Sequence, residues 1–257
     1  MIILFLCFLY IADKNMRWIL SICLLMSCII CNAAHDWHVH TLQQKDGLSS
    51  NNIKCMFKDS HGFMWFGTSN GLDIYDSSRI KSVNMGGVSI NSIAEVGGIM
   101  YIGTEQGLFI YDSSDGILKP FEARTSYLVT ISSPVTKLLA TGELLMVGTY
   151  GQGFFVCDTV TGTLVQNSIG MPYVTDMVRA DDGSIYLAEE STGIYDVSRR
   201  GDIKSHVLSR KGVSGLSIHE ADLYYICRDE PEIIGLVSGT EKKCAFQMPG
   251  LKTISGL

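Results

Sequence analysis

The sequence FMWFGTSNGLDIYD at residues 63–76 is matched by IMYIGTEQGLFIYD at residues 99–112, which is the strongest structural signal in the chain. The two stretches align without a gap, and both keep a Gly-Thr pair, a Gly-Leu pair and a final Tyr-Asp pair. A third copy begins at Pro134, and a fourth begins at Tyr173 with Ala188-Glu189 in place of Gly-Thr. Self-similarity at a period of about forty residues is typical of repeat folds.

Each copy divides into four short strands. An apolar run such as residues 53–57 is followed by a turn rich in Asp and Gly, a second apolar run, a second turn with Gly, and a third run that ends on Tyr-Asp or Cys-Asp. A more polar fourth strand follows, for example around residues 203–207. Four antiparallel strands in about forty residues describe one blade of a propeller.

The predicted fold class is therefore all-β, a β-propeller of four-stranded antiparallel blades. A fifth copy, from Val213, keeps only the apolar pattern, and LKTISGL at the C-terminus resembles the opening strand of a sixth. We assign residues 35–257 to a partial propeller of about five blades plus one strand. Its predicted repeats are residues 50–86, 87–131, 132–171, 172–211 and 212–249, with a sixth beginning at 250–257. Trp65, Tyr101 and Tyr186 recur at one blade position, which favours core packing.

The N-terminus has a different composition. From Met16 the chain has a basic start, a hydrophobic stretch through Cys31 and small residues at 32–34, a pattern typical of a secretory signal peptide. We predict a signal peptide at residues 1–34, with Met16 as an alternative start and a periplasmic or exported protein as the product. An uncleaved anchor and lipidation at Cys28 are the alternatives. Export permits disulfides, but Cys55, Cys157, Cys227 and Cys244 are far apart and are expected to be mostly free, buried thiols.

Composition excludes several classes of function. The chain has 257 residues, a net charge of −6 and 20 scattered Lys and Arg residues, so it offers no basic stripe for a nucleic acid. No cofactor motif, phosphate-binding loop or nucleophile elbow is present. We therefore predict no nucleic-acid partner, no cofactor and no catalytic residue.

The segment Asp46–Ile53, continued by Lys58–Thr68 and Asn70–Leu72, closely resembles the two-component regulator propeller repeat. That family builds periplasmic sensors of hybrid two-component histidine kinases, especially in gut Bacteroidetes. The resemblance implies a carbohydrate-derived ligand, a dimer in a full-length receptor, and a membrane connection only through the leader or through C-terminal parts missing here. Kinase, receiver and DNA-binding domains would follow Leu257, so the resemblance predicts a truncated sensor or a fragment.

Propellers close when one terminus supplies a strand to the last blade, and residues 38–42 look like that outer strand. Its receiving blade is missing from the sequence, and five blades plus one strand would leave exposed sheet edges. We therefore expect an incomplete propeller. A closed variant with five or six blades is the alternative.

Two groups of residues could form a metal-binding or a catalytic site. His35, His38 and His40 have the residue type for a metal site, but no fourth ligand is identifiable, so no metal site is predicted. Asp181-Asp182 and Glu189-Glu190 could form acid and base pairs. Both pairs fall in predicted turns, which favours solvated turn residues.

Turns that differ between the copies are the better candidates for ligand binding, because the loops at one end of a propeller diverge while the scaffold repeats. The divergent positions are Glu105, Gln106, Tyr150, Gln152 and Arg228–Glu230. The leading hypothesis is a ligand-sensing propeller whose individual binding residues stay open. The alternatives are a stand-alone propeller that acts as a protein-interaction scaffold, and a polysaccharide lyase or hydrolase.

Overall fold

The computed structural model describes residues 41–244, apart from residues 84, 114–115, 126–127, 169 and 238. The predicted signal peptide, the three histidines His35, His38 and His40, and the start of a sixth repeat at 250–257 lie outside the described residues. The chain divides into units at residues 1–41 and 42–257, and the blades belong to the second. No helix in the described part is long and apolar enough to cross a membrane.

Five sheets, antiparallel apart from one parallel pairing in the third, follow a short 3-10 helix, η1 (Gln44–Asp46) in the described residues. Blade 1 contains β1 (Ile53–Lys58), β2 (Met64–Thr68), β3 (Gly71–Tyr75) and β4 (Ile80–Val83). Blade 2 contains β5 (Ile90–Val96), β6 (Ile99–Thr104), β7 (Gly107–Asp112) and β8 (Ile117–Pro120). Blade 3 contains β11 (Val135–Thr141), β12 (Leu144–Thr149), β13 (Phe154–Asp158) and β14 (Thr163–Ser168), together with β9 (Glu122–Arg124) and β10 (Leu128–Thr130). Blade 4 contains β15 (Val174–Arg179), β16 (Ile185–Glu189), β17 (Gly193–Val197) and β18 (Ile203–Ser209). Blade 5 contains β19 (Val213–His219), β20 (Asp222–Cys227), β21 (Glu230–Val237) and β22 (Thr240–Cys244).

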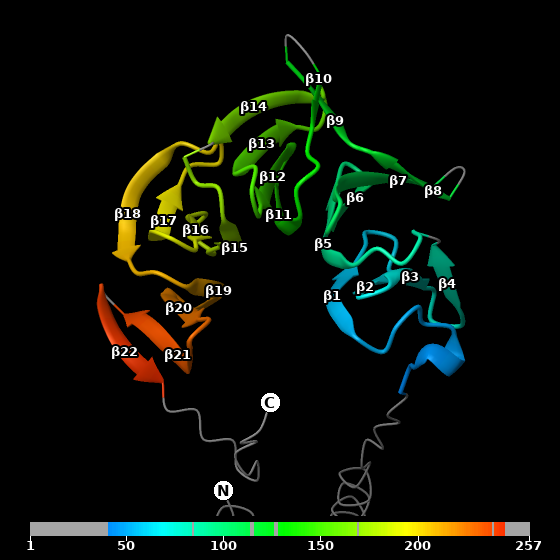
Figure 1. The fold of residues 1–257 in the computed structure, drawn as a ribbon, viewed down its shortest axis with the longest axis horizontal. Coiled ribbons are helices and arrows are strands. Elements are labelled where there is room, and N and C mark those ends of the chain that lie inside the picture. The colour runs from blue at the N-terminus through cyan, green and yellow to red at the C-terminus, as the bar shows by residue number, and fades with distance from the viewer. Residues whose placement is uncertain are drawn as a thin grey trace, which may run out of the picture. The chain divides into compact units, whose positions relative to one another are not determined.

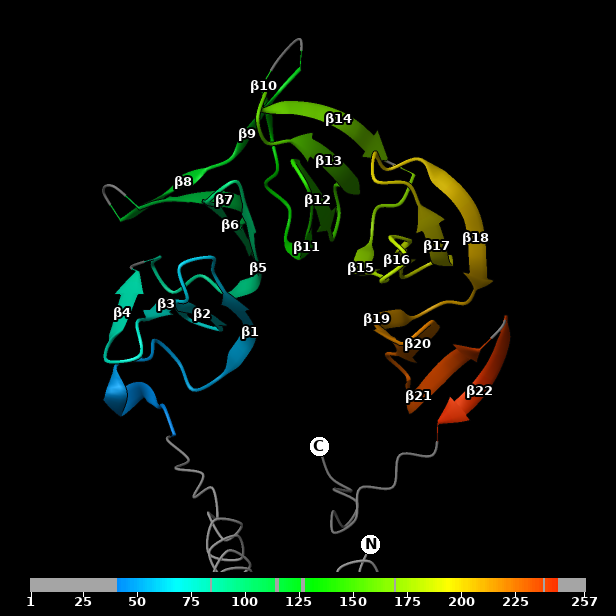
Figure 2. The same cartoon turned by 180° about the vertical axis from the view of Figure 1, so that it is seen from behind.

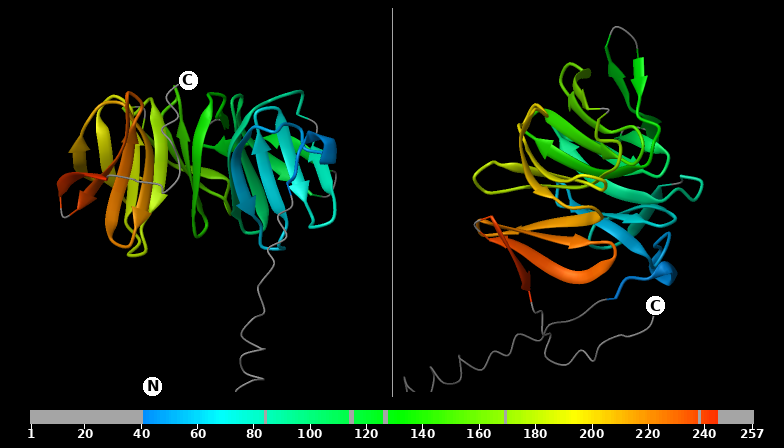
Figure 3. Two further views of the ribbon diagram at one scale, coloured as in Figure 1. Left: turned by 90° about the horizontal axis from the view of Figure 1, so that it is seen from below. Right: turned by 60° about the vertical axis from the view of Figure 1, so that its left-hand side comes forward.

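The blades stand along an arc with their first strands innermost (Figure 1). The first strand of each blade contacts the first strand of the next, from β1 through β5, β11 and β15 to β19. Figure 2 shows the same order from behind, and Figure 3 shows the blades edge-on. The predicted all-β propeller of four-stranded antiparallel blades, open rather than closed into a ring, is confirmed. Residues 41 and 42, the described part of the predicted outer strand, form no strand.

Blade 3 departs from the predicted four strands because its sheet has six. The long connection after β8 forms the hairpin β9–β10, and β9 adds to the outer edge of β14 through the pairing of Arg124 with Thr163. Phe121 and Ala123 anchor the start of this hairpin in the core between blades 2 and 3. The ring of Phe121 packs edge-on against Tyr101, with ring centroids 5.8 Å apart, and so joins the hairpin to blade 2.

The repeated glycine of the Gly-Thr pair lies where neighbouring blades come closest. A β-carbon added at Gly103 would lie 2.6 Å from Val135 Cγ1, and one added at Gly148 would lie 2.6 Å from Val174 Cγ1. Val135 and Val174 each open the first strand of the following blade and are fully buried. A β-branched residue therefore packs directly onto backbone, and only glycine leaves room for it at this distance.

A β-bulge follows that β-branched residue in every first strand. The bulge frees one side chain to reach the next blade. Asn91 Nδ2 donates to the carbonyl oxygen of Val135 at 3.0 Å, and Thr136 Oγ1 donates to that of Val174 at 2.7 Å. Thr175 Oγ1 likewise donates to the carbonyl oxygen of Val213 at 2.8 Å. We call this combination of glycine, β-branched residue and bulge hydrogen bond the blade seam; in blade 4 the place of the glycine is taken by Ala188, which packs in one cluster with Val213.

The recurring aromatic position lies mainly in the core. Trp65 and Tyr101 are buried, whereas Tyr186 is half-buried and packs against the cluster between blades 4 and 5.

The four cysteines of the described chain are free thiols, of which Cys157 and Cys227 are buried.

Replacing Gly148 by Ala should lower the free energy of unfolding by about 1–3 kcal/mol, because the new methyl group overpacks the stiff side chain of Val174. Urea denaturation of Gly148→Ala, Val174→Ala and the double variant measures the coupling. The double variant should lose less stability than the sum of the single losses. If the losses in unfolding free energy of the single variants simply add in the double variant, the contact between Gly148 and Val174 is contradicted.

Burial raises the pKa of the Cys157 thiol to about 12 from a usual value of 9.0. Because the folded pKa lies above the unfolded one, the stabilising contribution is complete below about pH 9 and is lost as the pH rises toward about 12. Cys157→Ala should therefore show a smaller loss of stability between about pH 8 and about pH 10.5 in urea denaturation. Cys244→Ala, at a half-buried thiol, is the control, and identical pH profiles for Cys157→Ala and the unmodified chain would refute the expectation.

Candidate functional site

The divergent residues chosen from the sequence lie at one end of the blades. All lie in the turn between the second and third strand of a blade, except Glu230, which begins the third strand β21, and we call this end the turn face. In each blade the first turn residue donates its backbone N–H to the segment that enters the same blade. These bonds are Ser69 to Asn52 (3.0 Å), Glu105 to Ser89 (3.1 Å), Tyr150 to Pro134 (2.8 Å), Glu190 to Tyr173 (3.0 Å) and Arg228 to Gly212 (2.8 Å). The backbone is thereby fixed while the side chains are free to differ.

A buried polar side chain stabilises the base of these turns. Thr104 Oγ1 accepts the backbone N–H of Gln106 at 2.9 Å and donates to the carbonyl oxygen of Gly107 at 2.9 Å. In blade 4 the equivalent residue is Glu189, and its Oε2 accepts the backbone N–H groups of Ser191 and Thr192 at 2.9 and 2.8 Å. One carboxylate oxygen thus satisfies two backbone donors of this turn.

The two acidic pairs, which the sequence predicts to be solvated turn residues, differ in how exposed they are. Asp181 and Asp182 are exposed in the turn between β15 and β16, in agreement with a solvated turn. Glu189 is only 1% exposed, so the prediction that it is solvated was wrong. The cause is its role inside the turn, where its Oε2 also accepts the Thr192 hydroxyl at 2.6 Å. Glu190 is half-buried.

Two exposed tyrosines meet on the turn face between blades 3 and 4. Tyr150 is 40% exposed and Tyr173 is 39% exposed, and their ring centroids lie 4.9 Å apart with the planes tilted by 44°. An isolated β-bridge joins the two residues, and the N–H of Gly151 donates to the carbonyl oxygen of Pro172 at 2.7 Å. The backbone therefore holds the two residues side by side, and both rings are partly open to solvent. We call these two residues the tyrosine platform.

An ion pair from blades 4 and 5 borders the platform. Arg228 Nη1 pairs with Glu190 Oε1, and the second oxygen of Glu190 is buried without a hydrogen-bond partner. Glu190 beside the Tyr150 hydroxyl raises the pKa of that phenol, whereas the guanidinium of Arg228 acts in the opposite direction. The arrangement joins three blades and offers aromatic rings, a carboxylate and guanidinium donors without excess charge.

The other predicted binding positions have different roles. Glu105 forms an ion pair with Lys54 at 3.3 Å, which links blades 1 and 2. Gln152 Oε1 accepts the N–H groups of the segment that enters blade 3 and so stabilises backbone. Glu230 pairs with Arg210 at 2.6 Å, while Gln106 and Asp229 are exposed.

Sequence reasoning chose Tyr150 and Arg228 but missed Tyr173 and the part played by Glu190. A signal for Tyr173 was present, because the residue before the first strand is small or polar, or a proline, in the other copies. Those residues are Asn52, Ser89, Pro134 and Gly212. An aromatic side chain at that one position marks a departure from the scaffold.

A polar cavity of about 390 Å³ lies against the inner strands on the concave side of the arc. Its walls include the bulged residues Lys54, Asn91, Thr136 and Thr175, whose hydrogen bonds to the next blade are part of the seam. The ion pair of Lys137 with Asp176, at 2.8 Å, spans blades 3 and 4 here. These groups are engaged in structure, and the turn face is the better candidate.

Comparison with known proteins agrees with this geometry. The two component regulator propeller family model matches residues 47–70. The match covers the entry segment, β1 and β2, including Ser49, whose N–H and hydroxyl bind the buried Asp73 carboxylate at 2.8 and 2.6 Å. The sequence resemblance to this repeat is thereby confirmed. No curated protein matches the chain.

Solved structures show the same fold at low sequence identity. The extracellular domain of BT4673 from B. thetaiotaomicron, described as a one component system, has a TM-score of 0.62 and 19% identity over 82% of this chain and 33% of that chain. The extracellular domain of BT3049 from the same organism, described as a hybrid two component system, has a TM-score of 0.62 and 20% identity over 79% and 31%. BamB from Moraxella catarrhalis has a TM-score of 0.52 and 15% identity over 77% and 62%. The chain thus spans about a third of the B. thetaiotaomicron domains.

Replacing Glu190 by Gln should lower the pKa of Tyr150, because the change removes the carboxylate that raises it. NMR titration of the protein with ¹³Cζ-labelled tyrosine measures this shift. The pKa of Tyr225, which burial and Glu241 raise, should stay unchanged and serves as the internal control. An unchanged Tyr150 pKa would contradict the arrangement of the site.

Proposed function

We propose that this chain is the ligand-recognition propeller of an exported two-component-type sensor, and that it binds an uncharged oligosaccharide across the tyrosine platform. The observation that carries the proposal is the pair of exposed tyrosine rings held together on the turn face by backbone hydrogen bonds between blades. The match to the regulator propeller family and the likeness to extracellular sensor domains support it.

The chemistry of the platform suits a sugar. Tyrosine rings present an apolar face on which the C–H groups of a pyranose ring can stack, and their hydroxyls stay available at the edge. Arg228, whose guanidinium is paired with Glu190 and stays exposed, can donate hydrogen bonds to sugar hydroxyls, in the pattern of a few polar groups beside an apolar surface. Because these two residues neutralise each other, we expect an uncharged glycan rather than an acidic one.

The platform is also placed to report binding to the rest of the propeller. Tyr173 directly precedes Val174, the residue that packs on Gly148 at the blade seam. The Glu190–Arg228 pair extends from the same place to blade 5. A ligand bound on the platform would therefore favour one arrangement of blades 3, 4 and 5 over another. A sensor requires that its ligand bind two arrangements of the protein with different affinity.

The test is a thermal-shift screen of the full chain against neutral and acidic oligosaccharides, followed by calorimetry on the best ligand. Tyr150→Ala and Tyr173→Ala should each weaken binding about tenfold or more, equivalent to about 1.4 kcal/mol of stacking and desolvation energy. Ile203→Ala, at an exposed apolar residue of the outer strand β18, is the matched control and should bind normally.

Binding that survives both tyrosine replacements would refute the platform. Failure of every glycan to stabilise the chain, combined with capture of a protein partner, would instead support a scaffold. Hydrolysis or lyase cleavage of the bound glycan would support an enzyme.

A further inference from the structure

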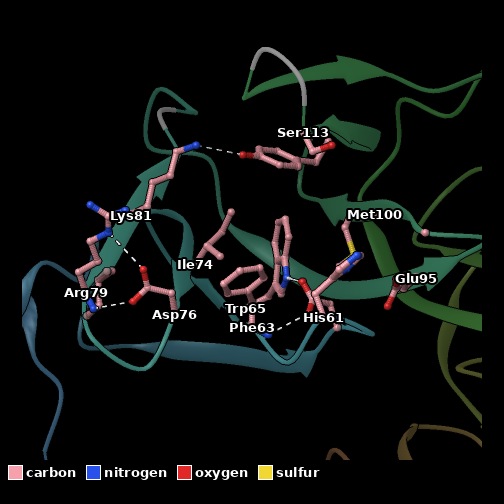
Figure 4. Close-up of a pocket in the computed structure, with 14 residues that line it drawn as sticks. His61, Phe63, Trp65, Ile74, Asp76, Arg79, Lys81, Glu95, Met100 and Ser113 are labelled. Carbon is pink, nitrogen blue, oxygen red and sulfur yellow. Dashed lines mark hydrogen bonds and ion pairs between the residues drawn. The ribbon is translucent and has the colours of Figure 1, made fainter.

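A second cavity, of about 740 Å³, lies between blades 1 and 2 at the end opposite the turn face (Figure 4). It is bordered by the turns that join β1 to β2, β3 to β4 and β5 to β6. Its size falls in the range of about 300–1,000 Å³ that is usual for small-molecule sites. The tyrosine platform belongs to blades 3 and 4, so the two places share no residue.

The inner wall of this cavity is apolar and aromatic. Trp65 and Tyr111 pack edge to face with ring centroids 5.1 Å apart, and Met100 and Ile74 complete the wall. The indole N–H of Trp65 donates to Asp59 Oδ2 at 2.8 Å. Trp65 and Met100 are only 4% and 6% exposed, so they form the floor behind the wall. The apolar surface open to the cavity belongs to Phe63, which is 41% exposed, and to the half-buried Ile74.

The carboxylates that border the cavity are already engaged. Asp59 accepts the indole N–H and two backbone N–H groups. Asp76 accepts Arg79 Nε at 3.1 Å, and Glu95 accepts the N–H and the hydroxyl of Ser60 at 2.7 and 2.5 Å. Hydrogen bonds to Ser78 and Arg79 hold the pKa of Asp76 well below its usual range, which keeps it charged and paired.

Lys81 differs from these groups. Its Nζ bonds only the hydroxyl of Tyr111, at 3.3 Å, and no carboxylate among the described residues pairs with it. An ammonium group has three donors, so at least two remain for a ligand. Figure 4 shows Lys81 on the opposite side of the cavity from Glu95, with Trp65 between them. An anionic group next to Lys81 is thus kept away from the Glu95 carboxylate.

We propose that this cavity binds a small aromatic carboxylate. The aromatic ring lies against Phe63 and Ile74, and the carboxylate accepts hydrogen bonds from Lys81. Charge complementarity at Lys81 and the apolar wall select this class over a sugar, whose hydroxyls would lose their water against Phe63 and Ile74 without gaining partners there.

The probe is naphthalene-2-carboxylate, titrated into the full chain by isothermal calorimetry, with naphthalene-2-methanol as its uncharged counterpart. The unmodified chain should bind one carboxylate probe and bind the alcohol at least about tenfold more weakly. Lys81→Met should weaken binding of the carboxylate about tenfold, and Lys81→Arg should retain it, because both basic side chains donate to a carboxylate. Lys81 is exposed, so these variants should fold normally.

Lys119→Met is the matched control, since Lys119 is an exposed lysine on the neighbouring outer strand β8 that pairs with Asp112 at 2.7 Å. It should bind the carboxylate normally, as should Tyr150→Ala. Absence of binding at millimolar probe, equal affinity for the alcohol, or an equal loss in Lys119→Met would each overturn the proposal. A loss in Tyr150→Ala would show that the probe occupies the tyrosine platform instead and would also overturn it.

Discussion

The contact between a β-branched side chain and the glycine of the preceding blade is the constraint on which this propeller depends. Val135 and Val174 each rest on backbone where no β-carbon fits. Neighbouring sheets are in direct contact at this position, and the bulge beside each valine supplies a hydrogen bond to the next blade. Close packing and the hydrogen bonding of buried polar groups are therefore achieved at the same position in successive blades. A short repeat can specify a large fold in this way.

A backbone hydrogen bond in each turn explains where binding residues can vary. Each turn on the turn face donates one backbone N–H to the segment that enters its own blade, and that bond needs no particular side chain. Tyr150, Tyr173 and Arg228 could therefore diverge from their counterparts without cost to the scaffold. The opposite end of blades 1 and 2 shows a second outcome, where Trp65 and Tyr111 line a cavity with Lys81 at its edge. Rigid seams beneath variable side chains are a suitable base for recognition.

Much of this could be predicted from the sequence because the repeated signals are local. Gly-Thr pairs, turn residues and apolar runs identify the blades, and divergence between copies selected Tyr150 and Arg228. The hairpin β9–β10 escaped prediction because its strands have three residues each and no alternation long enough to detect. Burial of Glu189 also escaped, since a turn carboxylate is usually solvated, and here two backbone donors hold it inside. The pairing of Tyr150 with Tyr173 depends on how two blades meet, which no single repeat encodes.

Residue-resolved hydrogen exchange of Thr136→Val tests the seam most directly. Thr136 donates to the carbonyl oxygen of Val174, and valine keeps the shape of the side chain without the donor. We predict faster exchange of amides in β11 and β15 together, with β1 in blade 1 unchanged, because each seam joins only neighbouring blades. A uniform acceleration through all five blades, or no change in β15, would contradict the account.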